Sequence, residues 1–341
     1  MKVLVTGAAG FLGSHICEEL LVTPWRGDIE VFGIDNLSGG DIDNVPVQML
    51  DEGTFVVADC CEYSDMLQYT ADGDVGIHCA ANPHEGLSVF SPLHITRNIF
   101  DASVSVMSAA IANKVKRFVF CSSMARYGEQ QPPFVESMIP APVDPYGISK
   151  VAAEDVLKTL CKVHGMEWNI AVPHNIIGPK QNYTDPYRNV ASIMINRNLR
   201  GLPSIIYGDG QQVRCFSYVA ECVEAIIKMA LDPLITSEVI NIGPDKGEMT
   251  IEQLADIIGE ITGNEEPHVF IDPRPQEVFH ATCSSDKART VLGYKETIDV
   301  REALEKTAEW IKKRGPKPFE YALPLEIVTD RTPSTWKEQL M

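Results

Sequence analysis

The chain begins MKVLVTGAAGFLG, residues 1–13, and this stretch decides how the rest of the sequence is interpreted. The run KVLVT is typical of a strand, and it leads directly into Gly7, Gly10 and Gly13. Residues 14–22 then have the pattern of an amphipathic helix. A strand, a glycine turn and a helix N-terminus suit a dinucleotide diphosphate, because glycines let the backbone approach the phosphates and the helix end attracts them. The stretch therefore predicts a dinucleotide-binding turn.

A second strand is expected over residues 30–34, and it ends on Asp35 and Asn36. Asp35 follows Gly13 by 22 positions, which is close to the spacing of the acidic residue that binds the adenosine ribose hydroxyls of NAD. The same carboxylate would repel the 2′-phosphate of NADP. The expected cofactor is therefore NAD.

Four more strands are expected before residue 178, and helical patterns separate most of them. The strands cover residues 54–58, 75–80, 117–121 and 168–173, and the longest helices cover residues 95–112 and 146–164. Strands that alternate with helices indicate an α/β fold with a doubly wound parallel sheet, the Rossmann arrangement. Ligands of such a sheet bind at the carboxyl ends of the strands, where Asp59, Ala80 and Ser123 fall.

The pattern changes beyond Asn175 to shorter elements with frequent proline and glycine. We therefore expect two domains: a Rossmann domain over residues 1–178 and a smaller C-terminal α/β substrate domain over residues 179–341. A strand at residues 239–242 is expected to return to the first domain. The tail from Pro316 has no clear periodicity, and we expect it to wrap around the rest of the chain.

Composition excludes several classes of function. The formal net charge of −18 argues against a nucleic-acid-binding protein, which would carry a basic stripe. The overall negative charge of the protein would repel an anionic substrate, so such a substrate has to be bound by a few arginines close to the site. No apolar run approaches the length of a membrane span, and the N-terminus lacks the pattern of a signal peptide. We expect a cytoplasmic protein with no membrane partner.

The nine cysteines are odd in number, scattered and free of CxxC spacing. They are Cys17, Cys60, Cys61, Cys79, Cys121, Cys161, Cys215, Cys222 and Cys283. Several lie in apolar runs, so we expect reduced, buried thiols. No spacing is typical of a metal site, and we expect no metal.

Tyr146 and Lys150 are the expected catalytic pair. They are four residues apart and share one face of the helix that they open. A phenol with a pKa of about 10 is a poor base at neutral pH, but a neighbouring ammonium group and the nicotinamide charge stabilise its phenolate. Tyr146 can then take a proton from a sugar hydroxyl while hydride leaves the same carbon for NAD. Ser123, at the end of the fifth strand, is placed to hydrogen-bond the same hydroxyl.

Several motifs together resemble one enzyme family, the extended short-chain dehydrogenases/reductases. The motifs are TGAAGFLG, FCSSMARYG at 120–128, PYGISK at 145–150, NIIGP at 175–179, YGDGQQVR at 207–214, NIG at 241–243 and RPQE at 274–277. Within that superfamily the chain resembles the NAD-dependent epimerase/dehydratase family, and most of all its UDP-glucose 4-epimerase group. The resemblance covers about residues 1–313.

The resemblance implies a site that holds NAD and a nucleotide sugar, most simply a UDP-sugar. The expected catalytic residues are Ser123, Tyr146 and Lys150. The expected cofactor-binding residues are Gly7, Gly10, Phe11, Leu12, Gly13, Asp35, Asn36, Asp59, Cys60, Ala80, Ala81 and Asn98, together with Tyr146 and Lys150. The expected substrate contacts are His84, Ser123, Asn175, Asn189, Arg214 and Arg274. We also expect a homodimer, built from the helices at 95–112 and 146–164 as a four-helix bundle.

Departures from the family's patterns narrow the reaction. Related 4,6-dehydratases carry an Asp-Glu pair, and related decarboxylases a Glu, where this chain has Met124 and Ala125. The expected reaction is therefore epimerisation at C4 without hydrogen exchange with water; were a further base needed, His84 or Glu85 would be the first suspects. Ala281 aligns with a position that is bulky in epimerases restricted to plain hexoses, so an N-acetylated sugar is also expected to fit.

Two other functions remain compatible with the sequence. One is a nucleotide-sugar oxidoreductase of the same superfamily, which would consume reduced cofactor in each turnover. The other is a non-catalytic dinucleotide sensor, although sensors of this superfamily typically lose the tyrosine or the lysine. Cys215 and Ala220 replace two common acids of the family, and this leaves the identity of the sugar open.

Overall fold

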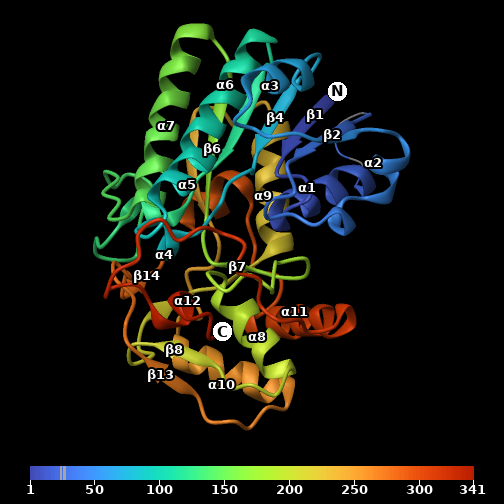
Figure 1. The fold of residues 1–341 in the computed structure, drawn as a ribbon. Helices are drawn as coiled ribbons and strands as arrows, with labels where there is room; N and C mark the ends of the chain where they lie inside the picture. The colour runs from blue at the N-terminus through green and yellow to red at the C-terminus, as the bar shows by residue number, and fades with distance from the viewer. Residues whose placement is uncertain (24, 26–27) are drawn as a thin grey trace.

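The structure is a computed structural model that describes residues 1–23, 25 and 28–341, and Figure 1 shows a larger α/β part above a smaller one. The strands are β1 (Lys2–Thr6), β2 (Glu30–Asp35), β3 (Phe55–Val57), β4 (Val75–His78), β5 (Arg117–Cys121), β6 (Glu167–Pro173), β7 (Ile176–Ile177), β8 (Ile205–Tyr207), β9 (Val213–Arg214), β10 (Ser217–Tyr218), β11 (Glu238–Ile242), β12 (Met249–Thr250), β13 (Val269–Ile271) and β14 (His280–Ala281). The helices are α1 (Phe11–Val22), η1 (Ile42–Asn44), α2 (Val47–Asp51), α3 (Tyr63–Tyr69), α4 (Glu85–Ser88), α5 (Pro92–Thr96), η2 (Arg97–Asp101), α6 (Ala102–Ala112), η3 (Met124–Tyr127), α7 (Pro145–His164), α8 (Val190–Leu199), α9 (Val219–Leu231), α10 (Ile251–Thr262), η4 (Ala288–Leu292), α11 (Val300–Arg314) and α12 (Ser334–Lys337).

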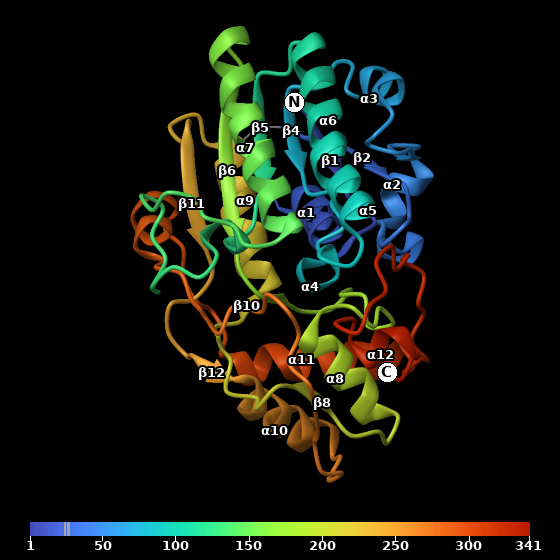
Figure 2. The same ribbon diagram turned by 60° about the vertical axis from the view of Figure 1, so that its left-hand side comes forward.

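Seven parallel strands form the main sheet in the order β11-β6-β5-β4-β1-β2-β3. Helices α1 and α9 cover one face, and α3, α6 and α7 cover the other (Figures 1 and 2). Val3 and Val5 of β1 belong to the core under α1 and α9, whereas Leu4 belongs to the core under α6 and α7. Both faces of the main sheet are buried at β1, which is why the sequence of β1 is a nearly continuous apolar run. The doubly wound Rossmann fold expected from the sequence is confirmed.

Three elements beyond residue 178 belong to the larger part: β11, α9 and the turn η4, whose Ala288 and Leu292 join the core of the main sheet. Strand β11 pairs in parallel with β6, as expected for residues 239–242. Helix α9 also packs against α1, and its apolar face, which includes Val223, Ile226 and Ile227, joins the core of the main sheet. The sequence pattern did not indicate this second return of the chain. The smaller part is therefore assembled from segments on both sides of α9 and β11.

The smaller part lies beyond the carboxyl ends of the main-sheet strands (Figure 2). Helices α8, α10 and α11 pack around a separate core that contains Ile195, Leu254 and Leu304. Short strand pairs, β8 with β13 and β9 with β12 and β14, complete this part. Ligands of the main sheet would therefore lie between the two parts.

The tail after Gly315 is mostly irregular and runs over both parts. The carboxylate of Glu326 accepts hydrogen bonds from the backbone amides of Leu93 and His94, at 2.9 and 2.8 Å. Trp336 of α12 is 1% exposed and packs edge-on against Phe90 and Tyr187. The tail is therefore packed against the rest of the chain through Trp336, although its sequence has no helical or strand periodicity.

The segment expected as a helix over residues 95–112 begins earlier and is subdivided. It comprises α5, the π-helical turn η2 and α6 in direct succession. Helix α1 likewise begins at Phe11, inside the glycine motif, and not at Ser14. Among the described residues, we find no helix that combines the length and apolar character needed to span a membrane.

Candidate functional site

The glycine turn after β1 is packed so closely that side chains do not fit at two of its positions. A Cβ atom at Gly13 would lie 2.1 Å from the carbonyl oxygen of Gly7. Gly7 has a φ of +75°, and a Cβ there would lie 2.8 Å from the amide nitrogen of Ala80. Helix α1 follows with Gly10 as its N-cap, which offers no side-chain acceptor to the first amides. These amides face the pocket and suit a phosphate.

Asp35 lies at the end of β2, with its carboxylate fixed by two backbone amides. Its oxygens accept from Ala9 at 3.0 Å and from Leu37 at 2.7 Å. Burial raises the pKa of Asp35, and these amides act in the opposite direction. Each carboxylate oxygen keeps a lone pair for a further donor, as binding of ribose hydroxyls requires.

One pocket at the carboxyl ends of the strands brings together all but one of the expected site residues. Lining it are Gly7, Gly10, Phe11, Leu12, Gly13, Asp35, Asn36, Asp59, Cys60, Ala80, Ala81, His84, Asn98, Ser123, Tyr146, Lys150, Asn175, Asn189 and Arg214. Arg274 does not line it, because its guanidinium pairs with Glu277 at 2.7 Å and stacks on the ring of Tyr207. The pocket extends from the glycine turn to the smaller part of the chain.

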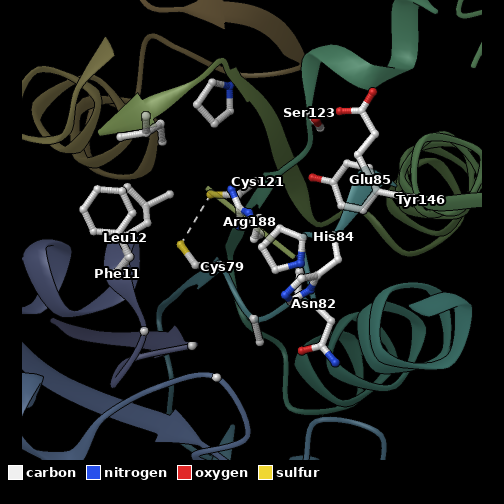
Figure 3. A pocket seen from close by; sticks show the side chains of 18 of the residues that line it. Phe11, Leu12, Cys79, Asn82, His84, Glu85, Cys121, Ser123, Tyr146 and Arg188 are labelled. Atoms are coloured by element: carbon white, nitrogen blue, oxygen red, sulfur yellow. Dashed lines mark hydrogen bonds between the residues drawn. The ribbon is translucent and has the colours of Figure 1, made fainter. Parts of the chain in front are cut away.

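Tyr146 and Ser123 lie side by side in this pocket (Figure 3). Asp144 caps α7 by accepting from the amide of Gly147 at 2.9 Å, and this fixes the start of the helix that carries Tyr146. Burial raises the pKa of Tyr146 to about 12, while the Ser123 hydroxyl and the Arg188 charge act to lower it. The phenol therefore needs positive charge nearby before it can act as a base.

Lys150, one helical turn from Tyr146, contacts two residues of β5. Its ammonium group donates to the carbonyl of Cys121 at 2.7 Å and lies 5.0 Å from the centre of the Phe120 ring. Burial lowers the pKa of Lys150 to about 8. The Arg188 charge acts to lower the pKa of Tyr146, while the Lys150 ammonium group is bound to the carbonyl at the end of β5.

The loop after β4 supplies His84 and Glu85. His84 is buried, and its Nε2 lies 2.6 Å from Oδ2 of Asp185 on the loop before α8. The Glu85 carboxyl points into the pocket on the side of Ser123 and Tyr146 (Figure 3). Glu85 is exposed to the pocket, and desolvation by the protein atoms around it, together with the neighbouring Asp144 charge, raises the pKa of its carboxyl to about 7.

Asn175, Asn189 and Arg214 line the end of the pocket formed by the smaller part. The Asn175 side chain donates to the carbonyl of Cys215 at 2.8 Å. Asn189 caps α8 by accepting from the amide of Ala191 at 3.1 Å. Arg214 donates to the carbonyls of Val213, Val278 and Phe279. All three side chains are therefore positioned by the protein itself.

Arg188 and Asp185 also line the pocket, although no sequence pattern indicated them. They belong to the loop between β7 and α8, which has no periodicity, and no recognisable motif marks them. Their proximity in sequence to Asn189 is the one signal that could have found them. No cluster of metal-ligating side chains occurs in the described part of the chain, and its nine cysteines are free.

Comparisons with known proteins identify the family. The model of the NAD dependent epimerase/dehydratase family matches residues 3–243, and the chain belongs to this family. The UDP-glucose 4-epimerase of Thermotoga maritima, solved with UDP-glucose, is 30% identical with a TM-score of 0.84, over 92% of this chain and 99% of that one. The UDP-glucose 4-epimerase of Thermus thermophilus, solved with NAD, is 29% identical with a TM-score of 0.82, over 92% and 99%. The dTDP-D-glucose 4,6-dehydratase of Mus musculus is 29% identical, over 92% of this chain and 89% of that protein.

The family membership agrees with the geometry of the pocket. The glycine turn leaves space for a diphosphate, and Asp35 offers acceptors to a ribose, so the residues present fit NAD. This protein is therefore an NAD-dependent enzyme of the nucleotide-sugar epimerase/dehydratase superfamily. Its relatives include both epimerases and dehydratases, so the family alone leaves the reaction open.

Proposed function

We propose that this protein catalyses the epimerisation of a nucleotide sugar at C4, through a transient 4-keto intermediate. The expected substrates are a UDP-hexose or a UDP-N-acetylhexosamine. The observation that supports this reaction is the pair of residues beside Ser123. Met124 and Ala125 line the pocket where dehydratases need an acid and a base, and neither side chain can transfer a proton.

Tyr146 would take the proton from the C4 hydroxyl, and Ser123 would hydrogen-bond the same oxygen. NAD, when bound beside Tyr146, would supply hydride-transfer chemistry at C4. Arg188 would lower the cost of the phenolate, since positive charge favours the ionised phenol, and Lys150, one helical turn from Tyr146, would add to this effect. The 4-keto sugar would then present its other face, and Tyr146 would return the proton.

Asn175, Asn189 and Arg214 would bind the nucleoside diphosphate at the far end of the pocket. A guanidinium suits this role because it can donate two parallel hydrogen bonds to phosphate oxygens. Arg274 does not line the pocket, so its contribution to substrate binding would be indirect, through its ion pair with Glu277. Ala281 lines the pocket with a small side chain, and this supports the expectation that an N-acetyl group fits.

Incubation of the purified protein with UDP-glucose and UDP-N-acetylglucosamine, followed by NMR of the products, tests the proposal. We expect inversion at C4 alone, with no net consumption of reduced cofactor and no deuterium from heavy water. Loss of water from the sugar would contradict the proposal in favour of a dehydratase. Stoichiometric NADH or NADPH consumption would favour the oxidoreductase, and NAD binding without turnover would favour the sensor.

We also propose a homodimer in which α5, α6 and α7 form the interface. Leu93 of α5 and Ile148 of α7 are exposed apolar side chains, at 75% and 53%. Phe100 of η2 and Val104 and Ile111 of α6 are only partly buried. An apolar surface of this kind favours association of two copies. Light scattering at micromolar concentration should give the mass of a dimer, and a clean monomer would contradict it.

A further inference from the structure

Helix α7 carries a fully buried carboxylate that the proposed reaction does not use. Glu154 lies eight residues beyond Tyr146 and is 0% exposed. Its Oε1 atom accepts from the hydroxyl of Ser122 at 2.5 Å, and its Oε2 atom lies 3.0 Å from Nη2 of Arg126. The ammonium group of Lys158 lies 3.4 Å from the same Oε2 atom. The carboxylate is therefore paired and hydrogen-bonded, as a buried charge must be.

Two of the partners of Glu154 lie on either side of Ser123 in the sequence. Ser122 precedes Ser123 directly, and Arg126 follows it by three residues, within η3. Both partners are buried, at 5% and 3% exposure. The Arg126 guanidinium also lies 5.2 Å from the centre of the Tyr127 ring. One carboxylate of α7 therefore holds the chain both before and after Ser123.

Ser123 and Tyr146 come from different elements, so their alignment depends on contacts between those elements. The Ser123 Oγ atom accepts from the amide of Ala125 at 3.2 Å, which leaves its hydroxyl proton for another acceptor. Ser123 and Tyr146 lie side by side (Figure 3), and the Ser123 hydroxyl acts to lower the pKa of Tyr146. Because Glu154 and Tyr146 share one helix, the contacts of Glu154 fix the turn of Ser123 relative to the phenol.

Stability alone does not account for this buried ion pair. Apolar side chains of similar volume often stabilise a fold as well as a buried pair does, because they avoid the cost of desolvating two charges. Glu154 and Arg126 instead provide directed contacts at two points around a short turn. Glu154 does not line the pocket, so it would reach neither the cofactor nor the sugar. Any effect on the reaction must pass through other residues.

We propose that Glu154 is a positioning residue: by holding Ser122 and Arg126, it keeps the Ser123 hydroxyl in place to hydrogen-bond the phenol of Tyr146. The catalytic groups remain Ser123, Tyr146 and Lys150. This inference deepens the proposed C4 reaction and rests on the roles given there to Ser123 and Tyr146.

The test compares three variants with the unmodified protein, all loaded with NAD. The variants are Glu154→Leu/Arg126→Met, Ser123→Ala and the combination of all three substitutions. The paired substitution removes both contacts around Ser123 and leaves no unpaired arginine in the core, so we expect it to fold. Tyrosinate absorbance over a pH titration, taken as the difference from the same protein with Tyr146→Phe, gives the pKa of Tyr146 without turnover.

Glu154→Leu/Arg126→Met and Ser123→Ala should each raise the pKa of Tyr146 by about one unit, because the phenolate loses a hydrogen bond. The combined variant should show no further rise, since the first effect passes through Ser123. With a nucleotide sugar, kcat should fall by about 10-fold in each variant, again without addition, and KM should be unchanged. The charged groups that face Tyr146 from other elements, Arg188 and Glu85, are present in every variant.

Glu260→Leu/Arg301→Met is the matched control, because it removes the same two charges from an exposed ion pair between α10 and α11. It should leave the pKa of Tyr146 and kcat unchanged. Retained NAD and an unchanged circular dichroism spectrum establish that the variants fold. Arg126→Met alone, which releases only one side of the turn, should give a smaller rise in the same direction and serves if the paired variant does not fold.

An unchanged pKa of Tyr146 in Glu154→Leu/Arg126→Met would overturn the proposal. A rise that persists in full in the Ser123→Ala background would also overturn it, because Glu154 would then act through Lys150, whose pKa its charge also helps to raise. If the pKa values change as expected but no sugar is epimerised, the C4 reaction is wrong and the positioning role stands. The titration therefore separates failure of this inference from failure of the proposed function.

Discussion

The Nε2 atom of His84 lies 2.6 Å from Oδ2 of Asp185, and this contact joins two loops that are 101 residues apart in the sequence. Both side chains are largely buried, at 8% and 15% exposure. One loop follows β4 of the main sheet, and the other precedes α8 of the smaller part. The contact therefore closes the pocket between the two parts and fixes the loop that carries Arg188.

Asp185→Ala should loosen this loop and weaken sugar binding. A largely buried hydrogen bond to a charged group contributes about 1.5–3 kcal/mol, so KM for the nucleotide sugar should rise by roughly 10- to 100-fold. Retention of NAD should be unaffected, because the contact lies away from the glycine turn. Steady-state kinetics and cofactor assay of the purified variant measure both. Asp155→Ala, exposed on α7, is the control; an unchanged KM in Asp185→Ala would mean that the contact does not position the loop.

Tyr146→Phe should keep the fold and the cofactor but lose most activity. Only the phenolic oxygen is removed, and deletion of a proton-transfer group typically costs about 10²- to 10⁴-fold in rate. Product formation with a nucleotide sugar, followed by NMR, measures the loss. Turnover close to that of the unmodified protein would exclude Tyr146 as the base.

The architecture was predictable because its signals are local. Strand β1, the glycine turn and α1 are consecutive, and each strand of the main sheet is a short apolar run that is recognisable by itself. The parallel sheet then follows from the alternation of strands and helices. Even the return of β11 could be anticipated, since the run at 239–242 is strand-like.

The charges of the site were less predictable because they depend on tertiary contacts. Arg188 and Asp185 lie on a loop without periodicity, and their roles come from His84, Tyr146 and the C-terminal tail. The four-residue spacing of Tyr146 and Lys150 predicted that Lys150 stabilises the phenolate of Tyr146. Spacing places both residues on one face of α7, but it does not reveal the hydrogen bond from the Lys150 ammonium group to the carbonyl of Cys121.

Gly13→Ala should abolish retention of NAD. The added Cβ would lie 2.1 Å from the carbonyl oxygen of Gly7, so the turn and the start of α1 must separate. The phosphate-binding amides then lose their alignment. Denaturing the purified variant and assaying the supernatant for NAD measures the effect. Val22→Ala, exposed at the other end of α1, should retain the cofactor; a fully loaded Gly13→Ala protein would contradict the packing described for the turn.

Trp336→Ala should detach the C-terminal tail and disturb the sugar end of the pocket. Truncation of a buried tryptophan typically costs about 3–5 kcal/mol, and here it removes the contacts with Phe90, Tyr187 and Tyr207. Hydrogen exchange should accelerate in residues 316–341 and 181–189, and KM for the nucleotide sugar should rise. Ile327→Ala, a half-exposed tail position, is the control. Faster exchange in the tail with unchanged exchange at 181–189 would show that the tail does not support the loop.

Glu85 should give substrate binding a pH dependence near neutrality. Its carboxyl is exposed to the pocket, and partial desolvation by the protein atoms around it, together with the Asp144 charge, raises its pKa to about 7. Above pH 7 the ionised carboxylate accepts charge-assisted hydrogen bonds from sugar hydroxyls; as the pH falls through 7 it becomes protonated and these bonds weaken. KM for UDP-glucose should therefore fall roughly fivefold to tenfold between pH 6 and pH 8.

Glu85→Gln should remove this dependence and hold KM near its low-pH value throughout, because the amide resembles the protonated acid in shape and cannot ionise. Kinetics at several pH values, at constant ionic strength, measure the difference, and Glu305→Gln on exposed α11 should keep the profile of the unmodified protein. If Glu85→Gln also keeps that profile, another group titrates near pH 7, and Glu85 is not the hydroxyl acceptor on this side of the pocket.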